Sequence, residues 1–182
     1  MGTRHRMAAW TLAAILGAGA APAAAVETAQ VTVRLDDLTG MPAHDLAAAK
    51  SEAGRIFHAA GIDITWADQS DMPGRGHFML ILVNARSASP GDGGDIAGEA
   101  LRQTSRAYVY CNRLEVVTKH LNVDANMVLG RVMAHEIGHL LLPPNCHSRV
   151  GIMRPHVEFA QVGVNTFTGD QARLLREVVA GI

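Results

Sequence analysis

Only two of the 182 residues are cysteines, Cys111 and Cys146, so the chain can form at most one disulfide. That bond would join the strand expected near Tyr110 to the segment after residue 142. Two free thiols agree with the sequence equally well, because it does not give the distance between the two side chains. The sequence leaves both alternatives open.

Aromatic residues are also scarce, at 4% of the chain, and no basic cluster has aromatic residues interleaved with it. A protein that binds nucleic acid usually carries such a surface, so we expect no nucleic-acid partner. The glycine-rich stretch 87–98 is not followed by Gly-Lys-Ser/Thr. It is therefore predicted to be a surface loop and not a phosphate-binding loop.

The first 25 residues have the pattern of a signal peptide. Arg4 and Arg6 precede an uncharged apolar stretch, and Ala23-Ala24-Ala25 offers a small-residue cleavage site. A retained membrane anchor is the alternative, although Gly17 and Gly19 make the stretch a poor span. Cleavage would remove two of 16 basic residues and none of 17 acidic ones, which gives a net charge of about −3. We expect a secreted or periplasmic protein with no stable membrane association after cleavage.

No internal repeat or low-complexity linker divides residues 26–182, so they are predicted to form a single domain. The spacing of apolar residues, together with the glycines and prolines that separate the periodic segments, predicts strands and helices in a layered α+β or α/β arrangement. The expected strands are 31–35, 62–66, 77–83 and 106–110. The first expected helix is 43–60. A second runs from a cap at Asn122 or Asp124 to Leu142, and a third from Thr168 or Asp170 to Ala180. The strand 106–110 has two interpretations: an exposed edge that could pair with an extended peptide, or an ordinary internal strand.

The most informative feature is the His-Glu-x-x-His motif at 135–139, in the middle of an apolar helical pattern. Histidines four residues apart lie on one helical face, so both imidazoles can bind one divalent metal. Glu136 lies close enough to reach a metal-bound water, as the general base of zinc hydrolases does. Neutral imidazole ligands and a carboxylate base indicate zinc, and a catalytic zinc needs a third ligand.

The segments Asn145-Cys146-His147-Ser148 and Gly151-Ile152-Met153 follow that helix. With the motif, they make the chain resemble metzincin-type zinc peptidases, whose pattern is His-Glu-x-x-His-x-x-Gly-x-x-His and a methionine turn. The resemblance implies that zinc is held by His135, His139 and His147, with Glu136 as catalytic base and Met153 beneath the site. It also implies a metzincin-like (zincin) α+β fold: a mixed twisted sheet with a backing helix, an active-site helix over 123–142, the methionine turn and a C-terminal helix.

The chain departs from that pattern after Leu142. His147 comes two residues later than the third histidine of the family, and Pro143-Pro144 stands where the family chain bends at glycine. This lengthened third-ligand loop is similar to that of small exported bacterial metzincin-like (matrixin-like) proteins. The sequence offers two alternatives to His147 as third ligand: the Cys146 thiolate, and Glu158 as in the zinc peptidases with a downstream glutamate.

The sequence thus predicts a zinc metalloendopeptidase that hydrolyses peptide or protein substrates through a zinc-bound water, with Glu136 as general base. The alternative is a catalytically weak or inactive zinc-binding protein that serves as an interaction module, and a metal-free structural helix is a third interpretation. The candidates for a further donor to the oxyanion, among which the sequence does not choose, are Tyr108, Tyr110, Arg154 and His156. The remaining histidines His44, His58, His77 and His120 show no ligand spacing and are expected to be structural or exposed.

Overall fold

The computed structural model describes residues 28–67, 77–84, 97–155 and 165–182. The elements in these ranges are β1 (Ala29–Asp37), α1 (Ala43–His58), β2 (Ile62–Ala67), β3 (His77–Val83), β4 (Gly98–Leu101), the 3₁₀ turn η1 (Arg102–Thr104), β5 (Arg106–Tyr110), α2 (Cys111–Leu121), α3 (Ala125–Leu141) and α4 (Gly169–Ala180). The predicted signal peptide and most of the predicted 87–98 loop lie outside the described residues. Among the helices in these ranges, none has the length and apolar character needed to cross a bilayer.

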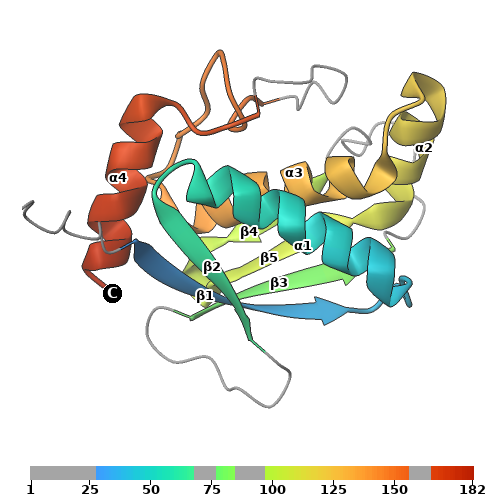
Figure 1. Cartoon of the computed structure of the whole chain (residues 1–182), viewed down its shortest axis with the longest axis horizontal. Helices are drawn as coiled ribbons and strands as arrows, with labels where there is room; N and C mark the ends of the chain where they lie inside the picture. Colours follow the sequence, from blue (N-terminus) through green and yellow to red (C-terminus); the bar gives the residue numbers. More distant parts are fainter. Residues whose placement is uncertain (1–27, 68–76, 85–96, 156–164) are drawn as a thin grey trace, which may run out of the picture.

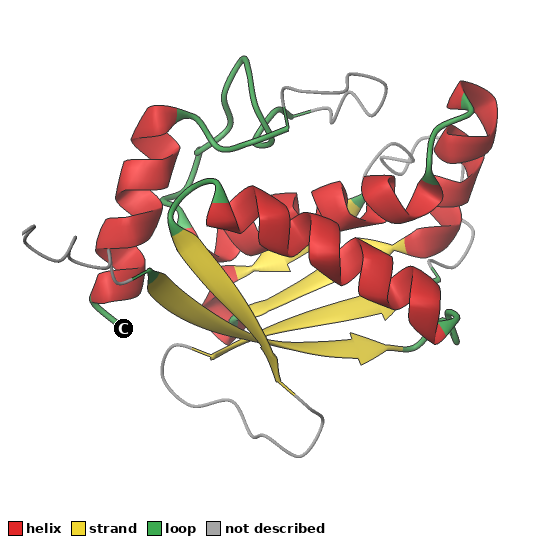
Figure 2. Ribbon diagram, viewed as in Figure 1, coloured by secondary structure: helices red, strands yellow, loops and turns green. Residues whose placement is uncertain are grey.

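The strands form one mixed sheet in the order β2-β1-β3-β5-β4 (Figures 1 and 2). Strands β2, β1, β3 and β5 run parallel, and β4 runs antiparallel to β5 at the edge. A mixed sheet with helices agrees with the α+β fold class predicted from the sequence. Strand β5 lies between β3 and β4, so of its two interpretations the internal strand is right.

Alternate side chains of three neighbouring strands build one buried face. In β1, Val33 and Leu35 are buried, and they are paired in register with Phe78 and Leu80 of β3. Leu80 is in turn paired with the buried Ala107 of β5. This period of two is what a strand needs in order to present one apolar face to covering helices. Helices α1 and α3 pack against each other and against the sheet (Figure 1).

Helices α1 and α3 approach closely at Gly130. A Cβ atom at this position would lie 2.6 Å from the backbone oxygen of Ala49 and 2.7 Å from the Cβ of Glu52. Such contacts are too short for any side chain, so the contact between the helices depends on this glycine. Since α3 carries the His-Glu-x-x-His motif, the contact also helps to fix the position of the motif relative to α1.

We expect Gly130→Ala to lower the free energy of unfolding by about 1–3 kcal/mol, because overpacking outweighs the gain in helix propensity. Gly54, in the interior of α1, is the matched control, since a Cβ there would meet nothing within 4 Å. Gly54→Ala should raise the free energy of unfolding by about 0.5–1 kcal/mol. Chemical denaturation of both variants measures the two effects, and equal effects would show that the helices do not meet at Gly130.

Three elements were not predicted: strand β4, the 3₁₀ turn η1 and helix α2. Strand β4 has four residues and begins at Gly98, which the sequence places at the end of a loop. Helix α2 begins at Cys111 without a capping side chain, so it lacks the usual sequence signal of a helix start. It ends at Leu121, and the C-cap residue Asn122 adopts a left-handed conformation (φ 50°). Of the two residues proposed to cap α3, Asp124 is therefore the cap.

Candidate metal centre

Helix α3 is fixed at both ends and along its length. The Asp124 carboxylate accepts hydrogen bonds from the backbone N–H groups of Asn126 (2.8 Å) and Met127 (3.3 Å), which satisfies donors that have no partner inside the helix. Leu142 is extended, as the residue before a proline prefers. Every residue from Val128 to Gly138 is buried. The motif therefore sits on a helix that core packing holds in one orientation.

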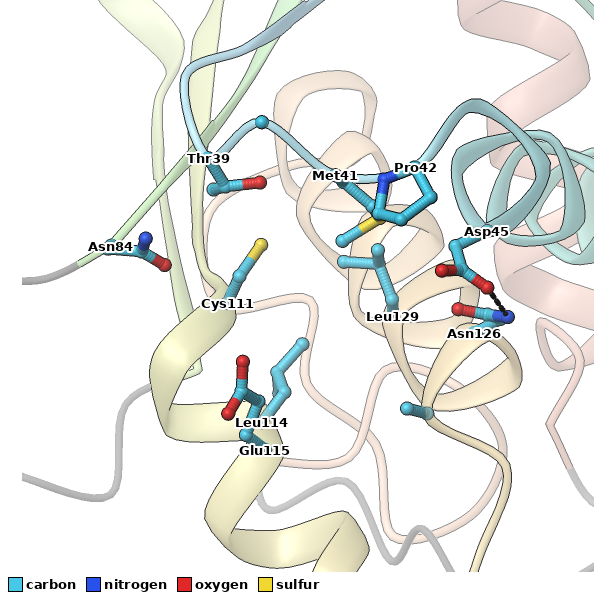
Figure 3. A pocket seen from close by; sticks show the side chains of 12 residues that line it. Thr39, Met41, Pro42, Asp45, Asn84, Cys111, Leu114, Glu115, Asn126 and Leu129 are labelled. Carbon is cyan, nitrogen blue, oxygen red and sulfur yellow. Dashed lines mark hydrogen bonds between the residues drawn. The ribbon is translucent and has the colours of Figure 1, made fainter.

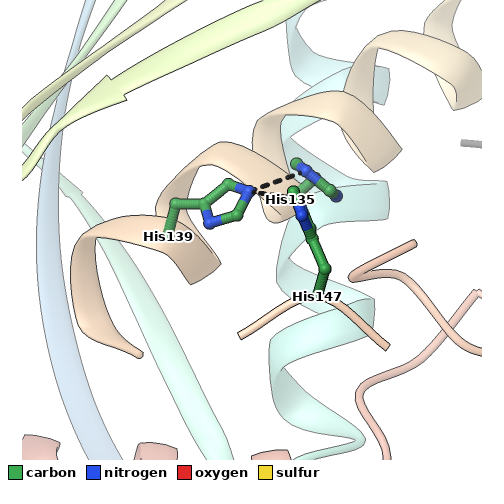
Figure 4. Close-up of side chains that lie close together, drawn as sticks. All are labelled: His135, His139 and His147. Atoms are coloured by element: carbon green, nitrogen blue, oxygen red, sulfur yellow. Dashed lines mark hydrogen bonds between the residues drawn. The ribbon is translucent and has the colours of Figure 1, made fainter. Parts of the chain in front are cut away.

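Three histidines converge at the carboxyl-terminal half of α3 (Figure 4). The Nε2 atom of His139 lies 2.9 Å from Nε2 of His135 and 3.0 Å from Nε2 of His147. One nitrogen from each ring lies within 4.8 Å of the other two. The structure thus brings together the three residues proposed as ligands, including His147 from the lengthened loop.

The ring of His135 is oriented by the segment around Met153. Its Nδ1 atom lies 2.8 Å from the backbone oxygen of Ile152, which can only accept, so Nδ1 carries the proton and donates it. The Nε2 atom is then left as a lone-pair donor aimed at the other two rings. This is the arrangement by which a second partner fixes the tautomer of a metal-binding histidine. The donor set therefore fits a divalent metal that prefers imidazole, such as zinc.

The surroundings also favour neutral imidazoles. Burial lowers the pKa of His135. Burial, followed by the neighbouring His135, His147 and Arg102, lowers the pKa of His139 to about 4. A neutral ring is the form that binds metal, so the environment prepares these two histidines to be ligands at neutral pH.

The segment Gly151–Met153 lies beneath α3, where the methionine turn was expected. Gly151 adopts φ 81°, and a Cβ there would lie 2.5 Å from the backbone oxygen of Thr166, so the turn requires glycine. Met153 is fully buried. A Cβ at Gly138 would lie 2.7 Å from its sulfur, so the glycine of the motif makes room for this methionine.

Glu136 points toward the edge strand. Its side chain is 5% exposed. A Cβ at Gly98, the first residue of β4, would lie 2.6 Å from its Oε1 atom and 2.7 Å from the backbone oxygen of Tyr108. Burial raises the pKa of Glu136 to about 8, and the charge of Glu99 acts in the same direction. A dication beside the carboxyl group would act in the opposite direction and favour the carboxylate.

Cys146 lies beside the cluster and outside it. Its sulfur is 3.3 Å from Nδ1 of His139, the nitrogen on the far side of the ring from the other two histidines. In the described part of the chain the group of side chains that could hold a metal is His135, His139 and His147. The other proposed ligand, Glu158, and the proposed oxyanion donor His156 lie outside the described residues.

The other residues considered in the sequence lie elsewhere. His44 contacts Asp45 (3.2 Å) and His58 contacts Asp63 (2.8 Å), and both histidines are largely exposed. Both cysteines are free thiols, which decides the question of the disulfide for this structure. Burial, followed by the charges of Asp37 and Glu115, raises the pKa of Cys111 to about 11. A thiol with a raised pKa stays protonated at neutral pH, which makes it a poor nucleophile.

Two polar residues lie near the site that the sequence did not place there. Arg102, in η1, donates a hydrogen bond to the backbone oxygen of His139 (3.4 Å). Glu99, in β4, accepts one from the hydroxyl of Tyr110 (3.4 Å). Of the proposed oxyanion donors, Tyr110 is therefore engaged by Glu99, and Arg154 donates to the backbone oxygen of Arg149 (3.1 Å). Arg102 is a cation that the structure places next to a proposed ligand.

A cavity of about 330 Å³ lies at the other end of α3 (Figure 3). It is lined by the loop after β1, by the start of α2 and by Asn126 and Leu129 in the first turns of α3. His135 and His139 lie in the last turns of that helix, and His147 lies in the loop that follows it. The cavity is therefore separate from the histidine cluster.

Comparison with known proteins finds a likeness in structure. No protein-family model matches the sequence, and no curated protein matches it. The fold is similar to the crystal structure of a zinc-dependent peptidase from Methanocorpusculum labreanum (strain Z), with a TM-score of 0.56 and 15% sequence identity. The match covers 80% of this chain and 99% of that chain. At this level of identity, the comparison establishes that the two chains share an α+β fold.

Proposed function

We propose that this protein is a zinc-dependent peptidase of the metzincin type. The observation that carries the proposal is the convergence of His147 with His135 and His139, because these residues come from a helix and from the loop after it. The fold shared with a zinc-dependent peptidase supports the proposal. Gly138 and Met153, packed together beneath the cluster, support the metzincin type.

His135, His139 and His147 would hold the zinc. When bound, zinc supplies Lewis-acid activation of water and of the peptide carbonyl. Glu136 is adjacent to His135 and lies between the cluster and β4, so it is the group that takes the proton from the attacking water and returns it to the leaving nitrogen. Its burial keeps competing solvent away from this exchange.

Strand β4 offers a place for the substrate. Its partner in the described sheet is β5, and its other side is an edge. An extended peptide can add to such an edge through backbone hydrogen bonds. Since Gly98 of β4 lies against the Glu136 carboxyl group, a peptide paired with β4 would pass beside the general base. Because the sequence predicts a signal peptide, we expect the protein to act on peptides outside the cytoplasm.

The test is a measurement of zinc content together with cleavage of a mixed peptide library. We expect one zinc per chain, cleavage within peptides, loss of both on treatment with a chelator, and recovery when zinc is restored. Zinc bound at one per chain without any cleavage would instead support the interaction-module alternative. Unchanged melting in chelator with no zinc found would overturn the proposal.

A further inference from the structure

Gln171 contacts the third-ligand loop on both sides of His147. Its amide nitrogen donates to the backbone oxygen of Cys146 (2.9 Å) and to the hydroxyl of Ser148 (3.1 Å). Its amide oxygen accepts from the backbone N–H of Thr168 (3.0 Å). The side chain is 7% exposed, so these are buried contacts in which both donors and the acceptor of the amide are used.

The loop needs an external tie because its own backbone is irregular. The segment between Leu142 and Ser148 contains no helix or strand, and Asn145 adopts φ 60°. His147 is itself exposed. Ordering such a segment costs conformational entropy, which contacts from a rigid element must offset. Gln171 supplies such contacts to the two residues that flank His147.

The same contacts also reach a second histidine. Gln171 binds the backbone carbonyl of Cys146. The sulfur of the same cysteine lies 3.3 Å from Nδ1 of His139. Holding the backbone of Cys146 therefore holds a neighbour of the His139 ring as well as the chain leading to His147. Second partners of this kind orient metal-binding rings.

Helix α4 is a firm support for Gln171. Thr168 and Gln171 form a capping box, in which each side chain binds the backbone of the other. Leu175 and Val179 are buried, and α4 packs against β1 and α3. Core packing in α4 is thereby connected to a loop 23–25 residues earlier in the chain.

We propose that Gln171 is a positioning residue of the metal centre, which holds His147 through its two neighbours, Cys146 and Ser148, and His139 through Cys146. This inference rests on the proposed function, because it takes the bound group to be zinc. Gln171 compensates for the missing glycine bend by tying the lengthened loop to α4.

The test compares zinc affinity among variants, measured by competition with a chelator at neutral pH. Gln171→Glu keeps the size of the side chain and the acceptor for Thr168, but its carboxylate cannot donate to the Cys146 carbonyl. We expect it to bind zinc about 10–100-fold more weakly, the usual effect of losing an outer partner. Thr168→Ala is the matched control: it removes the hydroxyl that accepts from the Gln171 backbone N–H, but it keeps the Thr168 backbone N–H that binds the Gln171 amide oxygen and both donors of that amide. It should lower the melting temperature and leave zinc affinity unchanged.

Cobalt substitution gives a second readout. The visible spectrum should change in Gln171→Glu and stay the same in Thr168→Ala. If Gln171→Glu does not fold, Ser148→Ala removes one of the two contacts from the loop side, and it should weaken zinc binding by a smaller factor. The inference would be overturned if Gln171→Glu bound zinc with wild-type affinity and had the wild-type cobalt spectrum. If Gln171→Glu does not fold, the same result in Ser148→Ala would overturn it. A wild-type protein that binds no zinc would overturn the proposed function instead.

Discussion

Replacing Glu136 by glutamine should abolish peptide cleavage and leave zinc bound. Glutamine has nearly the same size, so it fits beside Gly98, but it cannot accept the proton of the attacking water. Loss of a general base lowers kcat by about 10²–10⁴-fold. The three histidines are unchanged, so the zinc content should remain one per chain. Steady-state kinetics and elemental analysis on the same preparation measure both effects.

The control is Glu177→Gln, the same chemical change at an exposed residue that pairs with Arg173 on α4. It should retain the wild-type kcat. If Glu136→Gln retained cleavage at a comparable rate, another group would be the base, and the role of Glu136 would be structural. If it lost zinc as well as activity, the experiment would show that the carboxyl group holds the centre together.

The second large effect is expected for His147→Ala. The variant keeps two imidazoles, which hold a catalytic zinc poorly, so its affinity should fall by more than the roughly 10–100-fold caused by loss of an outer partner. Because His147 is exposed, its removal should leave the fold intact, as circular dichroism would show. Chelator competition measures the affinity, and His44→Ala, at a largely exposed histidine, is the control.

Cys146→Ser distinguishes the two neighbouring candidates for third ligand. The sulfur contacts the far side of the His139 ring, so its replacement should have a smaller effect on zinc affinity than His147→Ala. The reverse order would make Cys146 the ligand. In that case the backbone of the loop would have to shift by one residue, so that Cys146 and not His147 faces the other two histidines.

The part of the site that could be predicted lies on one helix and the loop that follows it. The period of the apolar residues and the stop at Pro143 predict α3, and the spacing of His135 and His139 places both on one face. His147 and Met153 follow in the same order as in the metzincin pattern. Neighbouring residues are enough to predict the helix and the placement of its two histidines, whereas the roles of His147 and Met153 were expected from the resemblance to that pattern.

The parts that could not be predicted depend on contacts between distant segments. Arg102 meets the backbone of His139 from 37 residues away, and Gln171 meets Cys146 from 25 residues away. Strand β4 is too short to show alternation, and its first residue, Gly98, is explained by the approach of Glu136. These contacts depend on how the sheet and helices pack, which no local pattern encodes.

X-ray absorption at the zinc edge of the wild-type protein measures which atoms of this chain bind the metal. We expect three imidazole nitrogens at about 2.0–2.1 Å from the metal and no sulfur. A sulfur neighbour at about 2.3 Å would show that Cys146 or Cys111 binds the metal and would contradict the three-histidine site.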